Sequence, residues 1–432
     1  MEIRLLMTGN ELMSGVTVDS NSAFIAQRLE TLNLRVGAKV TIGDDIERIV
    51  AGMDRLSRGC GLLLVNGGLG PTDDDLTAEA LARVLGVPLV EHPAALAHLE
   101  AWCGRRGLAL NAANRKQAFL PRGCELVANA VGSAVGFRAR HKDCEIVCTP
   151  GVPGELRVML EQEILPWLAA EFPDREPVVI TRMQVFGIGE STLQQRLREQ
   201  IPDWPAGVEL GFRAGAPLLE LKVSSFSREH QSARIATEQR VRGVLGDLLV
   251  GTGETTLPRR VIELLGERGE TVCLAESCTG GLLAALLTEV PGASRVFESG
   301  WVTYANTAKA RELGVREATL ERHGAVSEAV VREMAEGALR ESGAHRVLAV
   351  SGIAGPEGGS AEKPVGSVWI AWGSPAAIRA VELYFPVARK LFQTMVAATA
   401  LDLLRRELLG ISAEPRYFRE RRVPRQGPGT AT

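Results

Sequence analysis

The sequence predicts an α/β protein with several domains, and three observations lead to this prediction. Short apolar runs ending at glycine-containing turns alternate with helical patterns, as in parallel sheets covered by helices on both faces. This combination of strand, glycine turn and helix occurs once near the N-terminus and again in the C-terminal half. The chain has 432 residues, which is too long for one ordinary domain.

The first domain is expected over residues 1–168. Its pattern gives a strand at 3–7, a helix at 22–32, a strand at 35–42, a helix at 46–57 and an apolar strand at 61–65. This order of elements predicts a doubly wound sheet.

The last of these strands runs into the loop Asn66–Thr77, which has the sequence NGGLGPTDDDLT. Glycines at the start of a helix let backbone N–H groups approach a phosphate. The adjacent Asp73, Asp74 and Asp75 would repel a bare phosphate, so their presence favours a divalent cation between carboxylate and phosphate. In the alternative interpretation, the glycines form a tight turn and the aspartates cap the helix.

A small α+β domain is expected over residues 175–250. It contains strand patterns at 178–186 and 218–224 and helical patterns at 191–199 and 229–245, with Ser191 as an expected N-cap. No basic GxxG clamp for RNA is present, so a spacer or a dimerisation module is the simpler interpretation. Residues 251–256 are predicted to be a polar linker.

The third domain is expected over residues 256–412, starting with a helix at 257–267 and a strand at 271–275. The strand leads into a turn containing Ser277, Thr279, Gly280 and Gly281, and then into a helix at 282–288. With Thr279 as the N-cap, this turn predicts an anion cradle. The alternative is a capped helix that packs closely.

Ser294 follows, then a strand at 296–304 that ends at Tyr304, and a helix that contains Lys309. Asn306 is the expected N-cap and Gly314 the expected end of this helix. The helix dipole disfavours a cation in the first turn, so partial burial would lower the pKa of Lys309, as a lysine general base requires. The alternative is an ordinary solvated lysine.

A second glycine-rich run, 351–366, separates apolar strands at 347–350 and 367–372, and such a run suits close approach of a ligand. Arg389 precedes a long helix at 390–407 and is a candidate phosphate ligand. Residues 413–432 are rich in arginine and proline and are predicted to be a disordered tail.

Composition argues against several classes of partner and site. The net charge is −3, so the chain lacks the basic field that gathers nucleic acid. No signal peptide and no membrane-spanning run is evident, and a cytoplasmic location is expected. The seven cysteines contain no CxxC pair and the six histidines show no ligand spacing, so neither disulfides nor a zinc site are expected.

The N-terminal motifs resemble those of a known protein family. GNELMSG with Asn21, then GGLGPTDDDLT, and TPGVPGEL at 149–156 resemble the molybdopterin-binding-like domain of the CinA (competence/damage-inducible protein A) family. The resemblance implies metal-dependent hydrolysis of the pyrophosphate of ADP-ribose, with the identity of the divalent metal open. It also implies that the middle domain is KH-like. The implied metal ligands are Glu11, Asp74 and Asp75, and the implied phosphate contacts are Asn21, Gly67, Gly68, Gly70 and Thr72.

The C-terminal motifs AESCTGG, PGAS, GWVTYANTAK, GAVSE and SGIAGPEGGSAEKPVG resemble the nicotinamide-nucleotide amidase domain of the same family. The resemblance implies conversion of nicotinamide mononucleotide to nicotinate mononucleotide and ammonia, without a cofactor. The resemblance implies Ser294 as nucleophile, Lys309 as its base and Tyr304 as a proton relay. Ser277 competes as nucleophile, although its helix-start position fits phosphate binding better. The implied substrate-binding residues are Ser277, Thr279, Gly280, Gly281, Asn306, Ser351, Gly352, Gly355 and Arg389.

The sequence departs from the family pattern at a few positions. Ser351 stands where threonine is usual, which keeps the hydroxyl group. Phe385–Arg389 reads FPVAR where the family has F-x-G-D-R, and this changes the expected phosphate site around Arg389.

The expected partners are therefore nucleotides, without nucleic acid or membrane, in a homodimer or larger assembly. Two alternatives stay open. The chain could be a non-enzymatic, DNA-associated competence protein, or only one of its two nucleotide domains could be active.

Overall fold

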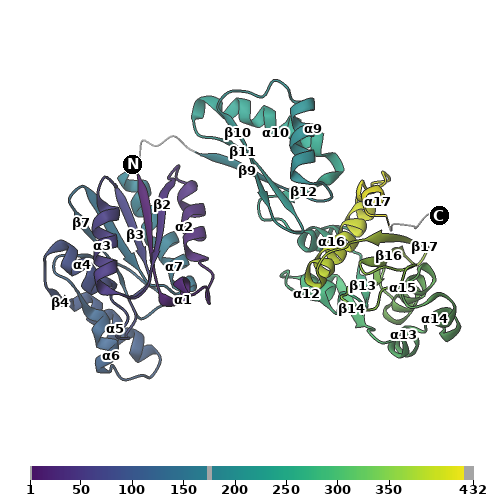
Figure 1. Ribbon diagram of the computed structural model, residues 1–432, viewed down its shortest axis with the longest axis horizontal. Coiled ribbons are helices and arrows are strands. Elements are labelled where there is room, and N and C mark those ends of the chain that lie inside the picture. Colours follow the sequence, from purple (N-terminus) through teal and green to yellow (C-terminus); the bar gives the residue numbers. More distant parts are fainter. Residues whose placement is uncertain (1, 173–177, 423–432) are drawn as a thin grey trace, which may run out of the picture. The chain divides into compact units, whose positions relative to one another are not determined.

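The computed structural model describes residues 2–172 and 178–422 (Figure 1). The chain divides into two compact units. The first contains the residues up to 179 together with 226–228, and the second contains the rest.

The first unit is built on a six-stranded sheet with the order β2-β1-β3-β8-β7-β6. The strands β1 (Ile3–Thr8), β2 (Val36–Ile42), β3 (Leu62–Asn66) and β8 (Cys144–Thr149) are parallel. The strands β7 (Gly136–His141) and β6 (Glu125–Val127) extend the sheet in antiparallel pairing. The predicted doubly wound sheet is therefore confirmed.

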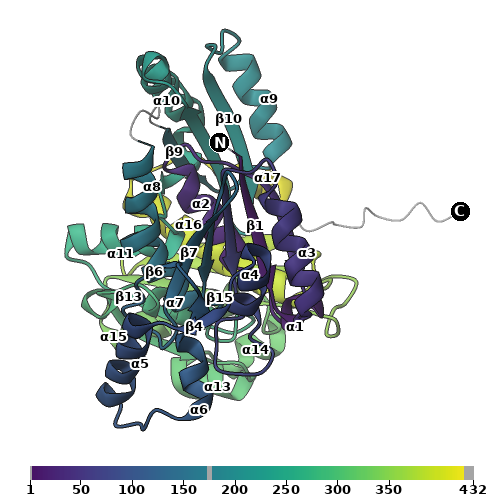
Figure 2. The same cartoon turned by 90° about the vertical axis from the view of Figure 1, so that its left-hand side faces the viewer.

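Helices cover both faces of this sheet, as the alternation of its buried side chains requires. In β3, Leu63 and Val65 belong to one core and Leu62 and Leu64 to the other. The first core lies under α3 (Ile46–Ser57), α4 (Thr77–Leu85) and α5 (Pro93–Arg105), and the second under α2 (Asn21–Glu30), α7 (Pro153–Met159) and α8 (Leu165–Glu171). Figure 2 shows β1 between α3 and α8.

Shorter elements complete the first unit. They are α1 (Asn10–Met13), α6 (Ala112–Arg115), a 3-10 turn at Lys116–Ala118, a π-helical turn at Leu160–Ile164, and an antiparallel pair formed by β4 (Leu89–Glu91) and β5 (Phe119–Pro121). The β4–β5 pair is separate from the main sheet.

The middle segment forms a four-stranded sheet with the order β10-β11-β9-β12. Its strands are β9 (Val179–Val185), β10 (Val208–Ala214), β11 (Leu219–Ser225) and β12 (Leu249–Thr252). Its helices α9 (Glu190–Gln200) and α10 (Gln231–Leu245) share one core with the sheet, and 3-10 turns occur at Arg228–His230 and Gly246–Leu248. The segment is therefore α+β, as predicted.

Three details of the middle segment differ from prediction. Strand β10 was not predicted, because only its first residue is buried and the apolar alternation is weak. Part of the predicted linker 251–256 belongs to β12. Helix α9 begins after Gly189 with no side-chain cap, so the expected N-cap role of Ser191 is wrong.

The C-terminal sheet has the order β14-β13-β15-β16-β17. The strands β13 (Val272–Glu276), β14 (Phe297–Val302) and β15 (Arg346–Gly352) are parallel, and β16 (Ser367–Ser374) and β17 (Ala377–Tyr384) are antiparallel. One face is covered by α11 (Leu257–Arg268), α12 (Leu282–Thr288) and α16 (Arg389–Leu408). The other is covered by α13 (Asn306–Leu313), α14 (Glu317–His323) and α15 (Glu328–Ser342).

The segment after α16 differs from the predicted tail. Residues 413–422 fold back, with α17 (Tyr417–Glu420) against the domain. Tyr417 is buried and its Oη lies 2.9 Å from Asp402 Oδ2, and Phe418 packs edge-on against Trp372. Disorder was predicted from the arginine and proline content, but the two adjacent aromatic residues outweigh it. The rest of the predicted tail, 423–432, lies outside the described residues.

No helix in the described ranges has the length and apolar character needed to cross a membrane.

Candidate functional site

A cavity of about 350 Å³ lies where the parallel strands β1, β3 and β8 of the first unit end. Doubly wound sheets bind their ligands at this edge. Its lining includes the predicted metal ligands Glu11, Asp74 and Asp75 and the predicted phosphate contacts Gly67, Gly68, Gly70 and Thr72. It also includes Asp44, which was not predicted, although its position just after β2 would have suggested this edge.

Asn21, the remaining predicted phosphate contact, is not among the residues that line this cavity. Its Nδ2 donates to Asn66 Oδ1 at 2.9 Å and to the Gly151 carbonyl at 2.7 Å. Asn66 in turn donates to Thr149 Oγ1 and to the Pro150 carbonyl. Asn21 therefore ties together the loops that follow β3 and β8, which positions the cavity wall.

The glycine loop is packed too closely for larger residues at two positions. Gly67 has a φ of +113°, and a Cβ there would lie 2.5 Å from the carbonyl oxygen of Thr8. Gly68 has a φ of +65°, and a Cβ there would lie 2.5 Å from Thr77 Oγ1. Both conformations are ones that glycine adopts at little cost.

Asp74 and Asp75 accept hydrogen bonds from Thr72 within the loop, and neither caps the start of α4. Thr72 donates to Asp75 Oδ2 from its backbone N–H at 2.8 Å and from its hydroxyl at 2.6 Å, and the same hydroxyl contacts Asp74. The N-cap of α4 is Leu76, without a side-chain cap. The alternative in which the aspartates cap this helix is therefore wrong.

The charges around the cavity repel each other. Burial raises the pKa of Asp44, and the negative charges of Glu11, Asp74 and Asp75 raise it further. These carboxylates are the hard oxygen donors that Mg²⁺, Mn²⁺ and Ca²⁺ prefer, so their chemistry fits a divalent cation. Within the ranges 2–172 and 178–422, however, no three His, Cys, Asp or Glu side chains converge closely enough to hold a metal as they stand.

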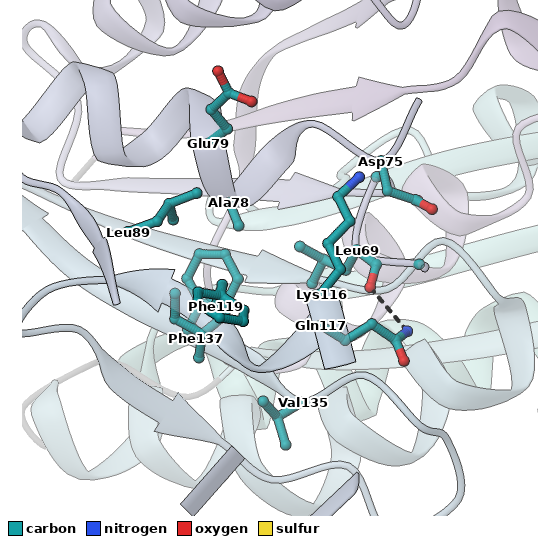
Figure 3. Close-up of a pocket in the computed structure, with 13 residues that line it drawn as sticks. Leu69, Asp75, Ala78, Glu79, Leu89, Lys116, Gln117, Phe119, Val135 and Phe137 are labelled. Carbon is teal, nitrogen blue, oxygen red and sulfur yellow. Dashed lines mark hydrogen bonds between the residues drawn. The ribbon is translucent and has the colours of Figure 1, made fainter. Parts of the chain in front are cut away.

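A second, smaller cavity of about 60 Å³ adjoins the first (Figure 3). The two share the wall formed by Gly68, Leu69, Gly70, Asp75 and Gln117. The far side of the smaller cavity is largely apolar and includes Leu89, Phe119 and Val135.

The second candidate site lies at the corresponding edge of the C-terminal sheet. Strands β13, β14 and β15 are parallel and end at Glu276, Val302 and Gly352, so the residues that follow them meet at one edge. The backbone continues this pairing, since Ser277 N donates to the Val350 carbonyl and Thr303 N to the Glu276 carbonyl.

Lys309 reaches this edge from α13 and is only 1% exposed. Its Nζ lies 2.7 Å from the Thr303 carbonyl, 3.3 Å from the Tyr304 carbonyl and 3.1 Å from Ser277 Oγ. Burial lowers the pKa of Lys309. In the neutral amine, two N–H groups serve the two carbonyls and the lone pair faces the serine hydroxyl. The alternative of a solvated surface lysine is wrong.

The structure does not bring Ser294 to Lys309. Ser294 is exposed in a 3-10 turn (Ala293–Arg295) that precedes β14, at the amino edge of the sheet. The full length of β14, roughly 20 Å at 3.3 Å per residue, separates this turn from the opposite edge. Within one chain, Ser277 and not Ser294 is the serine beside Lys309. The catalytic role of Ser294 stays a prediction.

The expected anion cradle at the start of α12 is occupied by the chain's own carboxylate. Glu276 is 1% exposed and accepts hydrogen bonds from Thr279 Oγ1 at 2.7 Å and from the backbone N–H groups of Gly281, Leu283 and Ala284 at 2.9–3.1 Å. Thr279 is not the N-cap, which is Gly281. The helix start is therefore satisfied internally, and the prediction that this turn holds a phosphate is wrong for this conformation.

The remaining predicted residues lie around the mouth of the site. Arg389, the first residue of α16, donates to Tyr304 Oη at 2.6 Å and to the Gly355 carbonyl at 2.9 Å. Ser351 is buried and donates to the Ala325 carbonyl at 2.7 Å, next to Gly352 at the end of β15. Asn306 is exposed as the first residue of α13, whose N-cap is Ala305, so its expected capping role is wrong. Gly280 is exposed.

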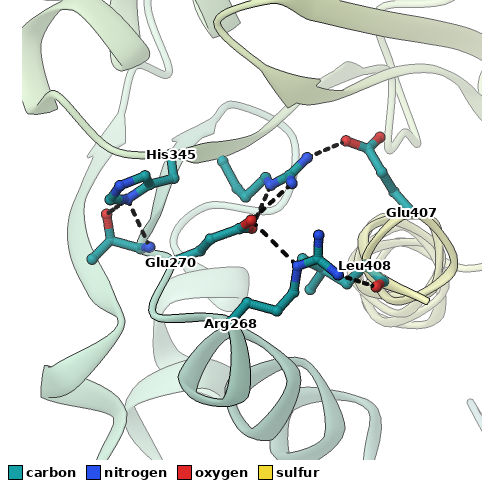
Figure 4. Close-up of polar contacts among 7 residues, drawn as sticks. Arg268, Glu270, His345, Glu407 and Leu408 are labelled. Carbon is teal, nitrogen blue, oxygen red and sulfur yellow. Dashed lines mark hydrogen bonds and ion pairs between the residues drawn. The ribbon is translucent and has the colours of Figure 1, made fainter. Parts of the chain in front are cut away.

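The opposite edge of the same sheet is held by ion pairs (Figure 4). Arg346, at the start of β15, pairs with Glu270 at 2.6 Å and with Glu407 of α16 at 2.7 Å. Arg268, at the end of α11, donates to the Leu408 carbonyl at 3.0 Å. These contacts hold α11 and α16 at the amino edge of the sheet, opposite the edge where Ser277 and Lys309 meet.

Comparison with known proteins gives two family matches. Residues 254–408 match the CinA C-terminal domain, and residues 4–170 match the probable molybdopterin binding domain. A CinA-like protein from Colwellia psychrerythraea is 47% identical, covering 97% of this chain and 98% of its own length. A CinA-like protein from Anaeromyxobacter sp. is 43% identical, covering 94% of this chain and 98% of its own length.

Among solved structures, a competence/damage inducible protein from Agrobacterium tumefaciens is 46% identical. The match covers 34% of this chain and 91% of the other, with a TM-score of 0.34.

Proposed function

This chain belongs to the CinA family, and we propose that its C-terminal domain is a nicotinamide-nucleotide amidase with Ser277 as the nucleophile and Lys309 as its base. One observation carries this proposal. A buried lysine with a lowered pKa lies 3.1 Å from a serine hydroxyl at the ligand-binding edge of the sheet.

The proposed reaction starts when Lys309 Nζ takes the proton of Ser277 Oγ and the oxygen attacks the carboxamide carbon. Lys309 then gives that proton to the amide nitrogen, the C–N bond breaks, and ammonia leaves. Water attacks the acyl-serine and gives a proton to Lys309, which returns it to Ser277 as the acid is released. The N–H groups of Cys278 and Thr279 have no acceptor in the described part of the chain and are the proposed oxyanion donors.

Arg389 and Tyr304 are proposed to bind the phosphate end of the nucleotide, because their polar groups stand at the mouth of the site. Glu276 is proposed to position Ser277 by fixing the turn that follows β13.

The test measures ammonia release from nicotinamide mononucleotide by the full chain. We expect Ser277→Ala and Lys309→Met each to lower kcat by about a thousandfold or more, because the two groups act as one unit. Ser294→Ala is the matched control and should retain wild-type activity. If Ser294→Ala abolishes ammonia release and Ser277→Ala does not, the nucleophile is Ser294 and the assignment fails.

For the N-terminal domain we propose a second function, hydrolysis of the pyrophosphate of ADP-ribose with a divalent cation. The observation in its favour is the gathering of Glu11, Asp44, Asp74 and Asp75 around a cavity that is also lined by the glycine loop. A divalent cation bound there would polarise the phosphoryl group. The loop N–H groups are proposed to bind the phosphates, and Glu11, Asp74 and Asp75 to hold the cation.

This second activity predicts AMP release from ADP-ribose that depends on a divalent cation. Asp75→Asn should lower this release by at least about a hundredfold without changing ammonia release from nicotinamide mononucleotide. Asp73→Asn is a matched control, because Asp73 is an exposed neighbour that does not line the cavity. Equal AMP release with and without a chelator would refute the metal requirement.

The competing class is a DNA-associated binding protein without turnover. The net charge of −3 offers little attraction for DNA. Salt-dependent DNA binding by a protein that turns over neither nucleotide would favour that class over the amidase.

A further inference from the structure

We propose that an apolar cavity in the second unit binds a small molecule that has an apolar body and a single protonated amine. The cavity has a volume of about 330 Å³ and lies where the turn between β10 and β11 meets α11, α12 and α16. A space of this size suits a ligand of small-molecule dimensions. The proposal does not rest on either proposed activity, because its lining residues belong to neither of the two sites described above.

The floor and the walls of this cavity are apolar. Leu257 of α11 and Ala398 and Leu401 of α16 are buried in the hydrophobic core and form the floor. Leu286 of α12 and Leu218, which precedes β11, pack against the same core and stay partly exposed. Covering such apolar surface removes it from water and lowers the free energy. The lining therefore favours an apolar occupant.

Three charged side chains stand around this apolar space. They are Glu254, Arg259 and Glu289, and all three are exposed. None of them has an ion-pair partner in the ranges 2–172 and 178–422. Two carboxylates against one guanidinium leave the lining with an excess of one negative charge, so it attracts a cation more than an anion.

These features select the class of ligand. A hydrocarbon or aromatic body covers the apolar floor, and an ammonium group at one end of it reaches the exposed carboxylate of Glu254 or Glu289. A carboxylate at that end would meet two like charges, and among the described lining residues only Arg259 would attract it. A primary amine on an apolar body is therefore the ligand that the lining complements.

The cavity is distinct from the proposed amidase site, although two helices contribute to both. Helix α12 begins just after the turn that holds Ser277, and α16 begins at Arg389. The cavity is lined by later residues of these helices, from Leu286 onward in α12 and from Thr394 onward in α16. Figure 1 shows the two helices side by side. Binding of the amine should therefore not compete with nicotinamide mononucleotide.

The test compares three probes that differ only in their end group: phenylbutylamine, phenylbutanol and phenylbutyrate. Their binding to the full chain is measured by NMR titration at neutral pH and low salt. Wild type should bind the amine about fivefold more tightly than the alcohol and about tenfold or more tightly than the acid.

Charge variants test the role of the end group. Glu254→Gln and Glu289→Gln should each weaken binding of the amine by about two- to fivefold and leave binding of the alcohol unchanged. Arg259→Gln should strengthen binding of the amine, because it removes a like charge. Glu298→Gln is the matched control, since Glu298 is exposed and does not line the cavity.

A cavity-filling variant tests the role of the apolar floor. Ala398→Phe should abolish binding of all three probes, because the new ring occupies the cavity. Ala285→Phe is its matched control, since Ala285 is an exposed alanine of α12 outside the lining, and it should bind as wild type does. Leu286→Trp fills the same cavity from α12 and replaces Ala398→Phe if urea titration shows that this variant does not fold.

Three outcomes would overturn the proposal. The first is equal affinity for the three probes in wild type, and the second is unchanged binding of the amine by a folded cavity-filling variant. The third is displacement of the amine by nicotinamide mononucleotide, which would place it in the amidase site. If no probe binds and Ala398→Phe abolishes self-association of the chain, the occupant is a second copy and the amine site is refuted.

Discussion

At the scale of single residues, Lys309 shows how position makes a common side chain reactive. It is buried, and its Nζ faces two backbone carbonyls and one hydroxyl. Each carbonyl accepts a hydrogen bond, so neutral Lys309 keeps its lone pair directed at Ser277. Loss of its charge avoids the cost of burying an unpaired ammonium ion.

This arrangement predicts the pH dependence of the amidase reaction. The pKa of Lys309 lies below its usual 10.5 because of burial, and catalysis needs the neutral amine. We therefore expect kcat/KM for ammonia release to fall tenfold per pH unit below a midpoint that lies under 10.5. Measurement of kcat/KM against pH checks this, and a midpoint at or above the usual lysine value would contradict it.

The same shift has a consequence for stability, measured as the free energy of unfolding. The folded pKa of Lys309 is depressed below the unfolded value, so between these two values the unfolded chain binds more protons. Stability therefore rises with pH across that window. Lys309→Met should remove this part of the pH dependence, as urea titrations at several pH values would show.

The sequence predicted which segment holds the serine and lysine of this site, but it did not predict which serine lies beside Lys309. The order of motifs placed Ser277, Ser294 and Lys309 in one stretch. The lowered pKa expected for Lys309 is found, and its cause is burial of the side chain. Ser294 and Ser277 lie at opposite edges of the sheet, and only the direction of β14 separates them. The direction of β14 therefore favours Ser277 over Ser294 as the partner of Lys309.

At the scale of elements, the start of α12 is organised by Glu276. Its carboxylate accepts three backbone N–H groups and one hydroxyl, so it replaces the usual N-cap and also compensates the helix dipole. The glycine-rich turn therefore wraps around an internal anion. Sequence reasoning recognised the turn as an anion cradle but missed that the anion comes from the preceding strand.

This capping predicts that Glu276 is important for local stability. Glu276→Ala leaves several buried donors unpaired and should lower the free energy of unfolding by about 3 kcal/mol. Glu289→Ala, at the exposed end of the same helix, should change it by no more than about 0.5 kcal/mol. Urea titration with hydrogen exchange of α12 amides gives the measurement. Equal effects of the two substitutions would rule out the capping role.

Helices and strands were predicted correctly where apolar residues recur with a regular spacing. They were missed where contacts with residues distant in the sequence determine the structure. The five elements predicted at 3–65 are found close to their predicted ends, and the short helix α1 was not predicted. Strand β10 has few buried side chains, and α17 depends on Tyr417 and Phe418 meeting partners distant in the sequence. Local sequence contains little information about such partners.

At the scale of the whole molecule, the second unit joins the middle segment to the C-terminal domain through buried polar contacts. Arg405 is 1% exposed, and its guanidinium donates to Asp402, to the Leu249 carbonyl at 3.1 Å and to the Asp247 carbonyl at 2.7 Å. Asp402 also accepts from Tyr417. Arg405 thus links α16 to β12, and its partner Asp402 links α16 to the segment that follows it.

This junction predicts a large effect of Arg405→Met in the full chain. The substitution removes the ion-pair partner of the buried Asp402 carboxylate, which keeps only Tyr417 as a donor, and it leaves the Leu249 and Asp247 carbonyls without the Arg405 donor. This should cost about 3–5 kcal/mol in the free energy of unfolding of the second unit. Arg419→Met is the control, since its side chain is 77% exposed and should have little effect. Chemical unfolding of both variants tests this, and matching midpoints would show that the junction is not important for stability.

The internal anion at Glu276 also bears on how the proposed amidase site would be inhibited. Because the helix start is already neutralised, a compound would gain little from placing a phosphate or carboxylate at the glycine turn. The cation available at the mouth is Arg389, which already holds Tyr304 and Gly355. A strong inhibitor would therefore combine an uncharged, serine-reactive head near Ser277 with a single anionic group spaced to reach Arg389. An inhibitor with a second anionic group at the glycine turn would be repelled by Glu276.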